Sequence, residues 1–260
     1  MSDGTKRPTR TASGDENSMQ PNLTDVRGIR AWGAYSGVKS KRRDLALIYS
    51  EEPAAAAAVF TRNVVVAEPI KLARRNIADG RAQLLVINSG NANACTGEQG
   101  RRGAEAMVEA AAEALDIAPS LVIVASTGII GRTFPTEDIV ESIRTSAPKL
   151  SNLRLAGSLA ANAILTTDTF AKASYSTFDL GGVECRMGGI AKGSGMIHPD
   201  MGTMLAFVVS DAAVAPRLLD EALHEAVDES FNMITVDGDT STNDMVCALA
   251  NGLAENPLIE

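Results

Sequence analysis

The feature of this sequence that most constrains its fold is a pair of short apolar segments that each run into a polar, glycine-bearing loop. Residues 82–90 read AQLLVINSG and residues 120–128 read SLVIVASTG. Short apolar segments bounded by turn-forming residues are typical of buried strands. Residues 103–117 lie between them and carry apolar side chains at helical spacing, which predicts a helix. A strand, a helix and a second strand in succession indicate a layered protein.

The rest of the chain continues this alternation. The patterns predict strands over residues 44–50, 57–67 and 203–212, and helices over residues 69–80, 136–150, 157–168 and 216–232. Residues 174–192 predict a hairpin that turns at Gly181 and Gly182, and residues 233–253 a strand, a polar loop and the start of a helix. The fold class is therefore α/β or α+β, with helices and sheets packed in layers.

Charge and hydropathy restrict the class of protein further. The chain has 260 residues and a formal net charge of -8, which argues against nucleic acid or an anionic membrane as a partner. It has no segment of about 18 apolar residues that could span a bilayer, and its start lacks the apolar core of a secretory signal. Residues 1–22 predict a disordered tail before a domain over residues 23–260. We expect a soluble, cytoplasmic protein.

The sequence offers no metal or cofactor motif. Its three cysteines, Cys95, Cys185 and Cys247, form no CxxC pair, so neither a zinc site nor a disulfide framework is predicted. The segment DGDTSTND over residues 237–244 lacks the glutamate of a calcium loop, and no glycine motif for phosphate binding is present. We therefore expect no metal and no tightly bound cofactor. A basic cluster over residues 39–43 is interpreted as a solvated turn.

Gly202 and Thr203 stand where a glycine-rich loop enters an apolar segment. In the simplest interpretation, the glycine ends the loop and the threonine begins a strand. The alternative is that the bond between them is cut, so that Thr203 becomes a new N-terminus. A threonine hydroxyl is a poor nucleophile until a base takes its proton, and a free α-amine with a pKa of about 7.7–8.0 can act as that base. Gly202 would tolerate the strained turn that such a cleavage uses.

Several segments, in order, resemble the blocks of the ornithine acetyltransferase family of arginine biosynthesis, the ArgJ-type enzymes. The resemblance extends from about residue 27 to the C-terminus, and its blocks are DLALIYSEEPAAAAAVFTRN, INSGNANACTG, STGIIGR, ILTTDT, KGSGMIHPDMGTML and DGDTSTND. It implies a layered α/β/β/α sandwich. It also implies a precursor that cuts itself before Thr203 into pieces 1–202 and 203–260, which associate as a heterotetramer.

The activity implied by the resemblance is a ping-pong acetyl transfer. N-acetyl-L-ornithine would acetylate Thr203, ornithine would leave, and L-glutamate would take the acetyl group. Acetyl-CoA is an alternative donor in some members of the family. Neither route requires a metal or a tightly bound cofactor.

The resemblance also assigns roles to particular residues. Thr127 and Gly128 match the oxyanion hole, and Thr166, Thr167 and Lys192 match substrate-contacting positions. The residues themselves leave plainer interpretations open. Thr127 and Gly128 could form a turn at a strand end, Lys192 could be a surface lysine, and the two threonines could stand at a helix end and cap the next segment.

This sequence departs from the family pattern at several positions. Gly202 replaces an alanine, Asp200 replaces an asparagine, and Ala171 replaces a proline. The chain ends at Glu260, before family members end, so we expect it to lack a region that supplies a substrate-contacting glutamate. Two other hypotheses therefore stay open. One is an amidohydrolase or aminopeptidase with an N-terminal nucleophile, and the other is an inactive, truncated member of the family.

Overall fold

In the part of the chain that the structure describes, eight strands form one hydrogen-bonded sheet in the order β4-β3-β2-β8-β7-β6-β5, and β1 pairs with β2. The computed structural model describes residues 19–196 and 204–260. The strands are β1 (Ile29–Ala34), β2 (Leu45–Phe60), β3 (Arg81–Asn91), β4 (Val122–Ile129), β5 (Lys172–Leu180), β6 (Val183–Lys192), β7 (Leu205–Ser210) and β8 (Met245–Ala250). The α-helices are α1 (Glu68–Asn76), α2 (Gly97–Leu115), α3 (Thr136–Ser146), α4 (Arg154–Ala163) and α5 (Pro216–Asp228).

The long strand β2 joins two halves of the sheet. Its first part pairs with β1 on one edge and β3 on the other, and its last part pairs with β8. The pairing with β3 is irregular between Tyr49 and Ala54. A bulge of this kind bends a strand and increases its twist. The two halves can therefore face each other as separate layers.

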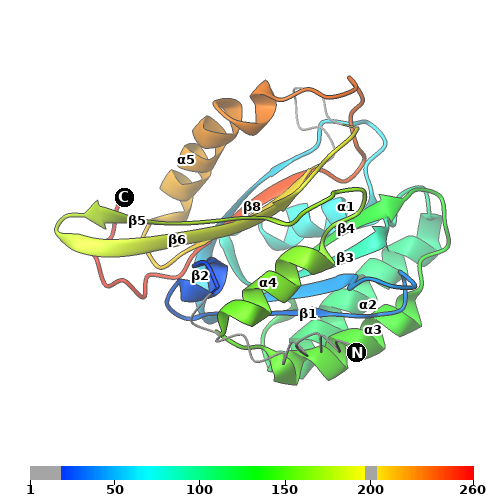
Figure 1. Cartoon of the computed structure of the whole chain (residues 1–260), viewed down its shortest axis with the longest axis horizontal. Coiled ribbons are helices and arrows are strands. Elements are labelled where there is room, and N and C mark those ends of the chain that lie inside the picture. Colours follow the sequence, from blue (N-terminus) through cyan, green and yellow to red (C-terminus); the bar gives the residue numbers. More distant parts are fainter. Residues whose placement is uncertain (1–18, 197–203) are drawn as a thin grey trace, which may run out of the picture.

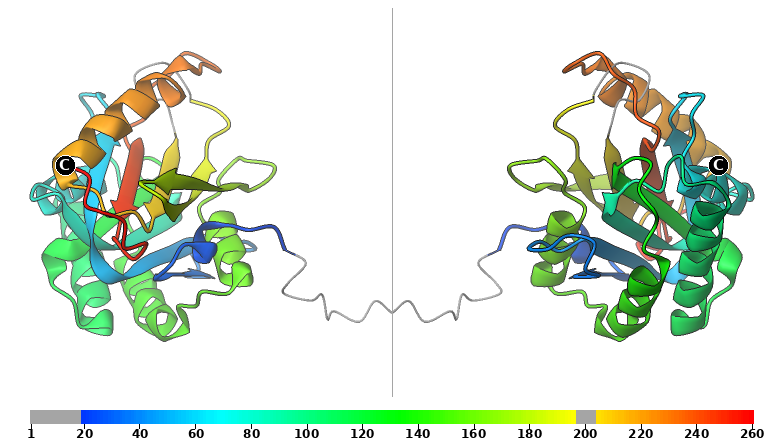
Figure 2. Two further views of the ribbon diagram at one scale, coloured as in Figure 1. Left: turned by 90° about the vertical axis from the view of Figure 1, so that its left-hand side faces the viewer. Right: turned by 90° about the vertical axis from the view of Figure 1, so that its right-hand side faces the viewer.

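Successive side chains of each strand point to opposite faces of its layer. They form one inner core between the two layers and an outer core between each layer and its helices. Leu85 and Ile87 of β3 share an inner core with Phe207 of β7 and with Cys247 and Leu249 of β8. The intervening residues of β3 pack against α2 and α3, and those of β7 and β8 pack against α5. Figures 1 and 2 show α5 outside one layer and α2 and α3 outside the other. This arrangement confirms the expected α/β/β/α sandwich.

Two parallel strand pairs meet at the same end of the molecule, where the carboxyl ends of β3 and β4 lie beside the amino end of β8. β3 and β4 are parallel with α2 between them in sequence, and β7 and β8 are parallel with α5 between them. The carboxyl ends of parallel strands meet at one edge of a sheet, where sites are commonly built. NSGNANACTG begins within the last residues of β3 and STG lies at the end of β4, so both polar segments lie at the carboxyl edge of this strand pair.

Several predicted elements are confirmed and others are corrected. β3, β4, α2 and the hairpin of β5 and β6 lie where the patterns indicated, and Gly181 and Gly182 have positive φ at its turn. Residues 61–67 are not a strand, because β2 instead begins at Leu45 and runs through the alanine-rich segment to Phe60. Residues 245–250 form β8 rather than the start of a helix, because all six are buried between the inner core and α5.

The described part of the chain begins at residue 19, within the predicted tail. Asn22 is buried, and its side chain accepts a hydrogen bond from the backbone nitrogen of Thr24 and donates one to the carbonyl of Arg154. The guanidinium of Arg154 in turn pairs with Asp25. These contacts fasten the entering chain to the start of α4. Residues 1–18 of the predicted tail lie outside the described residues.

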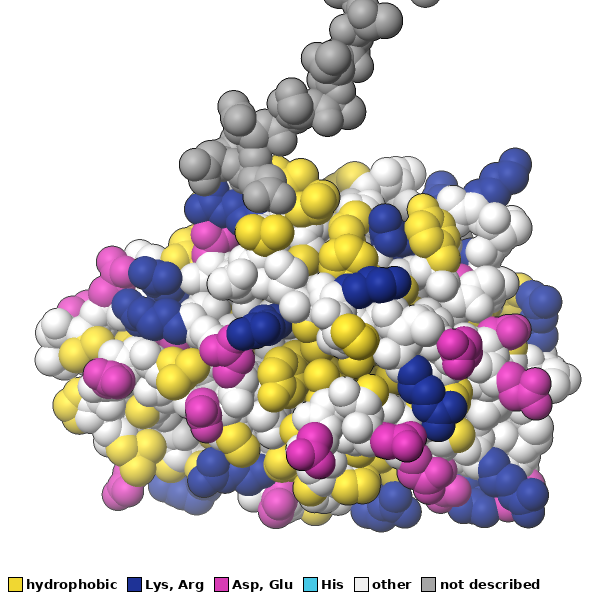
Figure 3. Space-filling model, turned by 90° about the horizontal axis from the view of Figure 1, so that it is seen from below, with side chains coloured by type: hydrophobic (Ala, Val, Ile, Leu, Met, Phe, Trp, Pro, Cys, Tyr) yellow, Lys and Arg dark blue, Asp and Glu magenta, His cyan; other side chains and the backbone are white. Residues whose placement is uncertain are grey.

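The surface carries charges of both signs. Figure 3 shows acidic and basic side chains interspersed with apolar ones over one face of the molecule. Within residues 19–196 and 204–260, no helix is both long enough and apolar enough to cross a membrane.

Candidate functional site

One cavity of about 800 Å³ brings together the predicted site residues that the structure describes. Thr127 and Gly128 reach it from the end of β4, Thr166 and Thr167 from the loop after α4, and Lys192 from the end of β6. The other predicted residues, Gly202 and Thr203, lie outside the described residues. The remaining lining residues are Val38, Lys39, Ser40, Gly90, Ile129, Arg132, Ser194, Gly195, Met196, Asp237 and Asp239.

The close approach of β3 and β4 requires a glycine at position 128. Its φ is +136°, and a Cβ added to it would lie 2.3 Å from the carbonyl carbon of Gly90. A side chain at this position would therefore be strained and would push the two strands apart. Thr127 beside it is 3% exposed, so its placement at the cavity wall is fixed by packing.

The loop before β8 supports the end of β4. The side-chain nitrogen of Asn243 donates to the carbonyls of Ser126 (2.9 Å) and Ala92 (2.6 Å). Asn243 is itself buried. Through Asn243, the polar segment over residues 237–244 therefore supports the strand end that carries Thr127. The sequence of this segment did not indicate that role.

Lys192 is a buried cation at the cavity wall. It is 2% exposed, and its Nζ donates to the Thr166 hydroxyl at 3.3 Å. Burial lowers the pKa of Lys192, although Asp168 and Asp244 act in the opposite direction. Among the described residues, no carboxylate lies within 4.0 Å of its nitrogen. The interpretation of Lys192 as a surface lysine is wrong, because β6 carries it into the space between the layers.

Asp168 connects two walls of the cavity, although the sequence did not single it out. One of its carboxylate oxygens accepts from the backbone nitrogen of Gly193 (2.8 Å) and from the ammonium of Lys172 (2.5 Å), and the other accepts from the nitrogen of Thr166. Burial alone would raise the pKa of Asp168, but these hydrogen bonds hold it below its ordinary value. The hydroxyls of Thr167 and Ser194 also lie 2.6 Å apart.

Lys39 holds the loop after α4 from the other side. Its Nζ donates to the carbonyls of Leu165 (2.5 Å), Arg43 (3.1 Å) and Ala163 (3.4 Å). A cation at the C-terminal end of a helix satisfies carbonyls that have no partner within the helix. Burial lowers the pKa of Lys39 to about 8, against the opposing effect of Asp44. The predicted solvated turn is therefore wrong for Lys39, which is partly buried.

Asp244 lies directly before β8 and carries a second unusual carboxyl group. Asp244 is 1% exposed, and its Oδ1 accepts from the backbone nitrogen of Met204 at 2.9 Å. Among the described residues its Oδ2 has no hydrogen-bond partner. Burial raises the pKa of Asp244 to about 7, although the Met204 nitrogen and Lys192 oppose the shift. The carboxyl of Asp244, whose pKa lies near neutral pH, thus accepts a hydrogen bond from Met204, the residue that follows Thr203 in the sequence.

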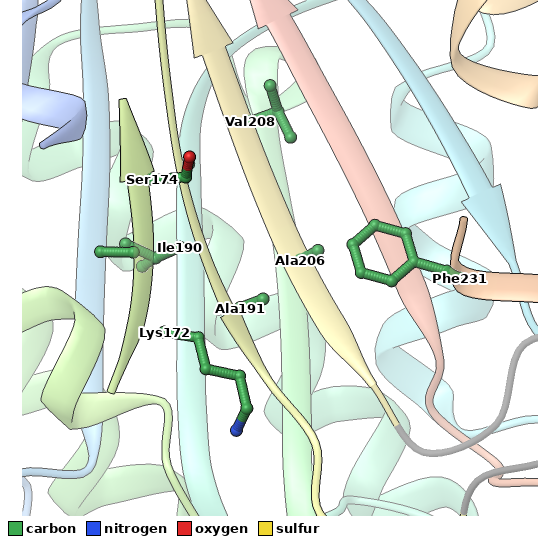
Figure 4. Close-up of a pocket in the computed structure, with 9 residues that line it drawn as sticks. Lys172, Ser174, Ile190, Ala191, Ala206, Val208 and Phe231 are labelled. Atoms are coloured by element: carbon green, nitrogen blue, oxygen red, sulfur yellow. The ribbon is translucent and has the colours of Figure 1, made fainter. Parts of the chain in front are cut away.

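A separate apolar pocket of about 220 Å³ lies beside the strands β5, β6 and β7. Figure 4 shows Ala191, Ala206, Val208 and Phe231 around it, with the Lys172 side chain at its edge. None of the predicted site residues that the structure describes lines this pocket. Its lining is mostly apolar, and the ammonium of Lys172 at its edge pairs with Asp168.

Metal ligation finds no support in the part of the chain that the structure describes. There, no three His, Cys, Asp or Glu side chains are grouped so that they could hold an ion. Cys185 and Cys247 are buried and Cys95 is exposed, all as free thiols. The groups that the large cavity offers are hydroxyls, backbone amides, ammonium groups and carboxylates.

Comparison with known proteins gives a consistent family. A model described as the ArgJ family matches residues 30–260. A curated relative, the arginine biosynthesis bifunctional protein ArgJ of Symbiobacterium thermophilum, is 53% identical over 240 residues, which cover 91% of this chain and 59% of the relative. This chain therefore spans less than two thirds of that relative's length.

Two solved structures resemble this one. The arginine biosynthesis bifunctional protein ArgJ from Bacillus halodurans has a TM-score of 0.67 and 40% identity, covering 71% of this chain and 94% of its own. The ornithine acetyltransferase of Mycobacterium tuberculosis, solved in complex with ornithine, has a TM-score of 0.62 and 32% identity, covering 70% of this chain and 95% of its own.

Proposed function

This chain belongs to the ArgJ family, and on that premise we propose that it transfers an acetyl group from N-acetyl-L-ornithine to L-glutamate in arginine biosynthesis. The observation that carries the proposal is the single cavity lined by Thr127, Gly128, Thr166, Thr167 and Lys192. These residues come from three segments far apart in the sequence. They supply hydroxyls, a backbone amide and a buried ammonium, which are the groups that acyl transfer between amino acids uses.

The nucleophile in this proposal is Thr203, released by cleavage of its bond to Gly202. The Thr203 hydroxyl attacks the Gly202 carbonyl carbon, the peptide C–N bond breaks, and the nitrogen takes the proton to become an α-amine. Water then hydrolyses the ester, leaving a carboxylate on Gly202 and a hydroxyl on Thr203. The hydrogen bond from Met204 to Asp244 supports this step, because it anchors the backbone on the C-terminal side of the nucleophile.

Acetyl transfer would then proceed in two similar steps. The α-amine of Thr203 takes the hydroxyl proton, and the oxygen attacks the acetyl carbonyl of N-acetylornithine. The Thr127 hydroxyl and the Gly128 N–H would stabilise the negative oxygen that forms. Loss of one such donor typically lowers the rate by about 10²–10³. Ornithine leaves as its nitrogen takes the proton, and the amine of glutamate then attacks the acetyl ester.

The charges of the cavity suit amino acids. The ammonium of Lys192 makes no ion pair with the described residues, so the carboxylate of a bound amino acid would supply its partner. Arg132 also lines the cavity, and Asp237 and Asp239 add carboxylates to its wall. Groups of both signs in one cavity favour a zwitterion over a neutral acyl compound. The complex of the Mycobacterium tuberculosis protein with ornithine supports the same class of ligand.

The proposal has further parts. The pieces 1–202 and 203–260 stay associated, as a heterotetramer, in the cytoplasm. The reaction needs no metal and no tightly bound cofactor, and acetyl-CoA is the alternative acetyl donor to be compared in the same assay.

The test is an acetyl-transfer assay with purified protein and isotopically labelled N-acetylornithine. Formation of N-acetylglutamate that depends on added glutamate is the expected result. Release of free acetate at the same rate with or without glutamate would instead identify a hydrolase. Absence of both products would identify an inactive chain.

A further inference from the structure

A second cavity of about 390 Å³ lies behind one wall of the first. The loop after α4 separates the two, since Thr166 and Thr167 line the first cavity whereas Leu165, Asp168 and Phe170 line the second. The segment before β2 also contributes residues to both cavities. Its residues 38–40 face the first cavity and residues 41–43 face the second. The second cavity is thus a distinct space that the proposed acetyl transfer does not use.

Three consecutive cations line this second cavity: Lys41, Arg42 and Arg43. Within residues 19–196 and 204–260, none of them has a carboxylate within 4.0 Å. Arg43 donates to the carbonyl of Gly33 at 2.7 Å, which fixes its position. The carboxylate of Asp168 also faces the cavity, but Lys172 already forms an ion pair with it. Uncompensated cations are unexpected in a chain with a net charge of -8, and they favour an anionic ligand.

Two aromatic rings flank these cations. Tyr35 is 59% exposed and Phe170 is 65% exposed, and both line the cavity. The guanidinium of Arg43 lies over the Tyr35 ring, 4.7 Å from its centroid, which orders the ring against a charged group. Exposed rings beside cations are the arrangement on which planar heterocycles stack while their phosphates are neutralised.

From these observations we infer that the second cavity binds a phosphate-bearing ligand with a planar ring, such as a purine nucleotide. Lys41 and Arg42 contact the phosphates, because arginine and lysine bind phosphate oxygens through charge-assisted hydrogen bonds. Phe170 stacks on the ring with the face that the Lys172 ammonium, 5.0 Å from the Phe170 centroid, does not cover. The inference does not rest on the proposed acetyl transfer, because the cavity, its charges and its rings are independent of Thr203.

Calorimetric titration of the purified chain at low ionic strength tests this inference, with ADP, pyrophosphate and adenosine as probes. We expect ADP to bind most tightly, pyrophosphate more weakly and adenosine most weakly. The double variant Lys41→Gln, Arg42→Gln should weaken both ADP and pyrophosphate about tenfold or more. Phe170→Ala should weaken ADP about fivefold or more and leave pyrophosphate unchanged.

The matched control is Arg81→Gln, Lys149→Gln, which removes two exposed cations elsewhere. This control should retain the affinity of the unaltered chain for ADP. All the substituted side chains are exposed, so every variant should fold, and thermal unfolding checks that it has. The inference is overturned if ADP shows no binding at millimolar concentration, if the control weakens ADP as much as Lys41→Gln, Arg42→Gln does, or if Phe170→Ala leaves ADP binding unchanged.

Discussion

The carboxylate of Asp168 accepts a hydrogen bond of 2.8 Å from the backbone nitrogen of Gly193, and this contact joins the loop after α4 to the end of β6. The two segments are 25 residues apart in sequence. Thr166 lies on one side of the contact and Lys192 on the other, and their side chains meet at 3.3 Å. The proposed substrate-binding wall therefore depends on a residue that need not touch substrate.

Replacing Asp168 by asparagine should loosen this wall. The change keeps the shape of the side chain but removes the charge that pairs with Lys172. Hydrogen bonds to charged groups are worth about 1.5–3 kcal/mol, so we expect KM for N-acetylornithine to rise about tenfold with a smaller change in kcat. Asp220→Asn, at an exposed position of α5, is the control. An unchanged KM in Asp168→Asn would show that the charge of Asp168 does not position the substrate-binding wall.

Lys192→Met should weaken substrate binding without unfolding the protein. Methionine fills a similar volume and needs no hydrogen bond, so the buried site remains packed. Loss of the ammonium should raise KM for both amino-acid substrates about tenfold or more. Steady-state kinetics with each substrate varied in turn measure the effect. Kinetics equal to those of an exposed control, Lys71→Met, would show that Lys192 binds no carboxylate.

Gly128→Ala should be far more damaging than Gly131→Ala. Both glycines have positive φ, but an added Cβ meets the Gly90 backbone at the first position and nothing within 4 Å at the second. We expect Gly131→Ala to cost about 1 kcal/mol and Gly128→Ala about 3 kcal/mol or more in the free energy of unfolding. Urea denaturation of both variants in parallel decides this. Equal losses would show that the close approach of β3 and β4 relaxes at little cost.

The free energy of unfolding of Asp244→Asn, compared with that of the unaltered protein at the same pH, should increase as the pH rises from 4 to 8. Burial raises the pKa of Asp244 from 3.8 to about 7 in the folded state. A raised acid pKa favours folding below the unfolded value, and that advantage is lost as pH rises through the folded value. The asparagine variant has no such ionisation cost, so its relative stability should increase by about 2–4 kcal/mol between pH 4 and pH 8.

This comparison is best made with Thr203→Ala in both chains, so that neither is cut. Denaturant titrations at several pH values then give the stability difference directly. A difference that stays constant from pH 4 to pH 8 would mean that Asp244 ionises without hindrance in the folded protein.

Much of the layered fold follows from local patterns. The buried strands β3 and β4 and the hairpin at Gly181 and Gly182 are encoded by short apolar segments and turn residues, and the structure confirms them. β8 was mistaken for the start of a helix because it is buried on both faces. Such a segment shows no alternation that would distinguish a strand from a helix.

The cavity could be predicted only in part. Resemblance pointed to Thr127, Gly128, Thr166, Thr167 and Lys192, and the chain folds so that all five share one cavity. The groups that support these residues were missed for a common reason. Lys39 bonds to carbonyls 124 and 126 residues away, and Asp244 to an amide 40 residues away. Contacts between distant segments leave no periodic signal in the sequence.

The central claim is that Thr203 becomes an N-terminal nucleophile, and the intact mass of freshly purified protein under denaturing conditions tests it most directly. We predict two pieces that meet at Gly202 and Thr203, the same two pieces for Thr203→Ser, which keeps the hydroxyl, and one uncut chain for Thr203→Ala. A single uncut mass for the unaltered protein, or cleavage of Thr203→Ala at the same bond, would contradict the account.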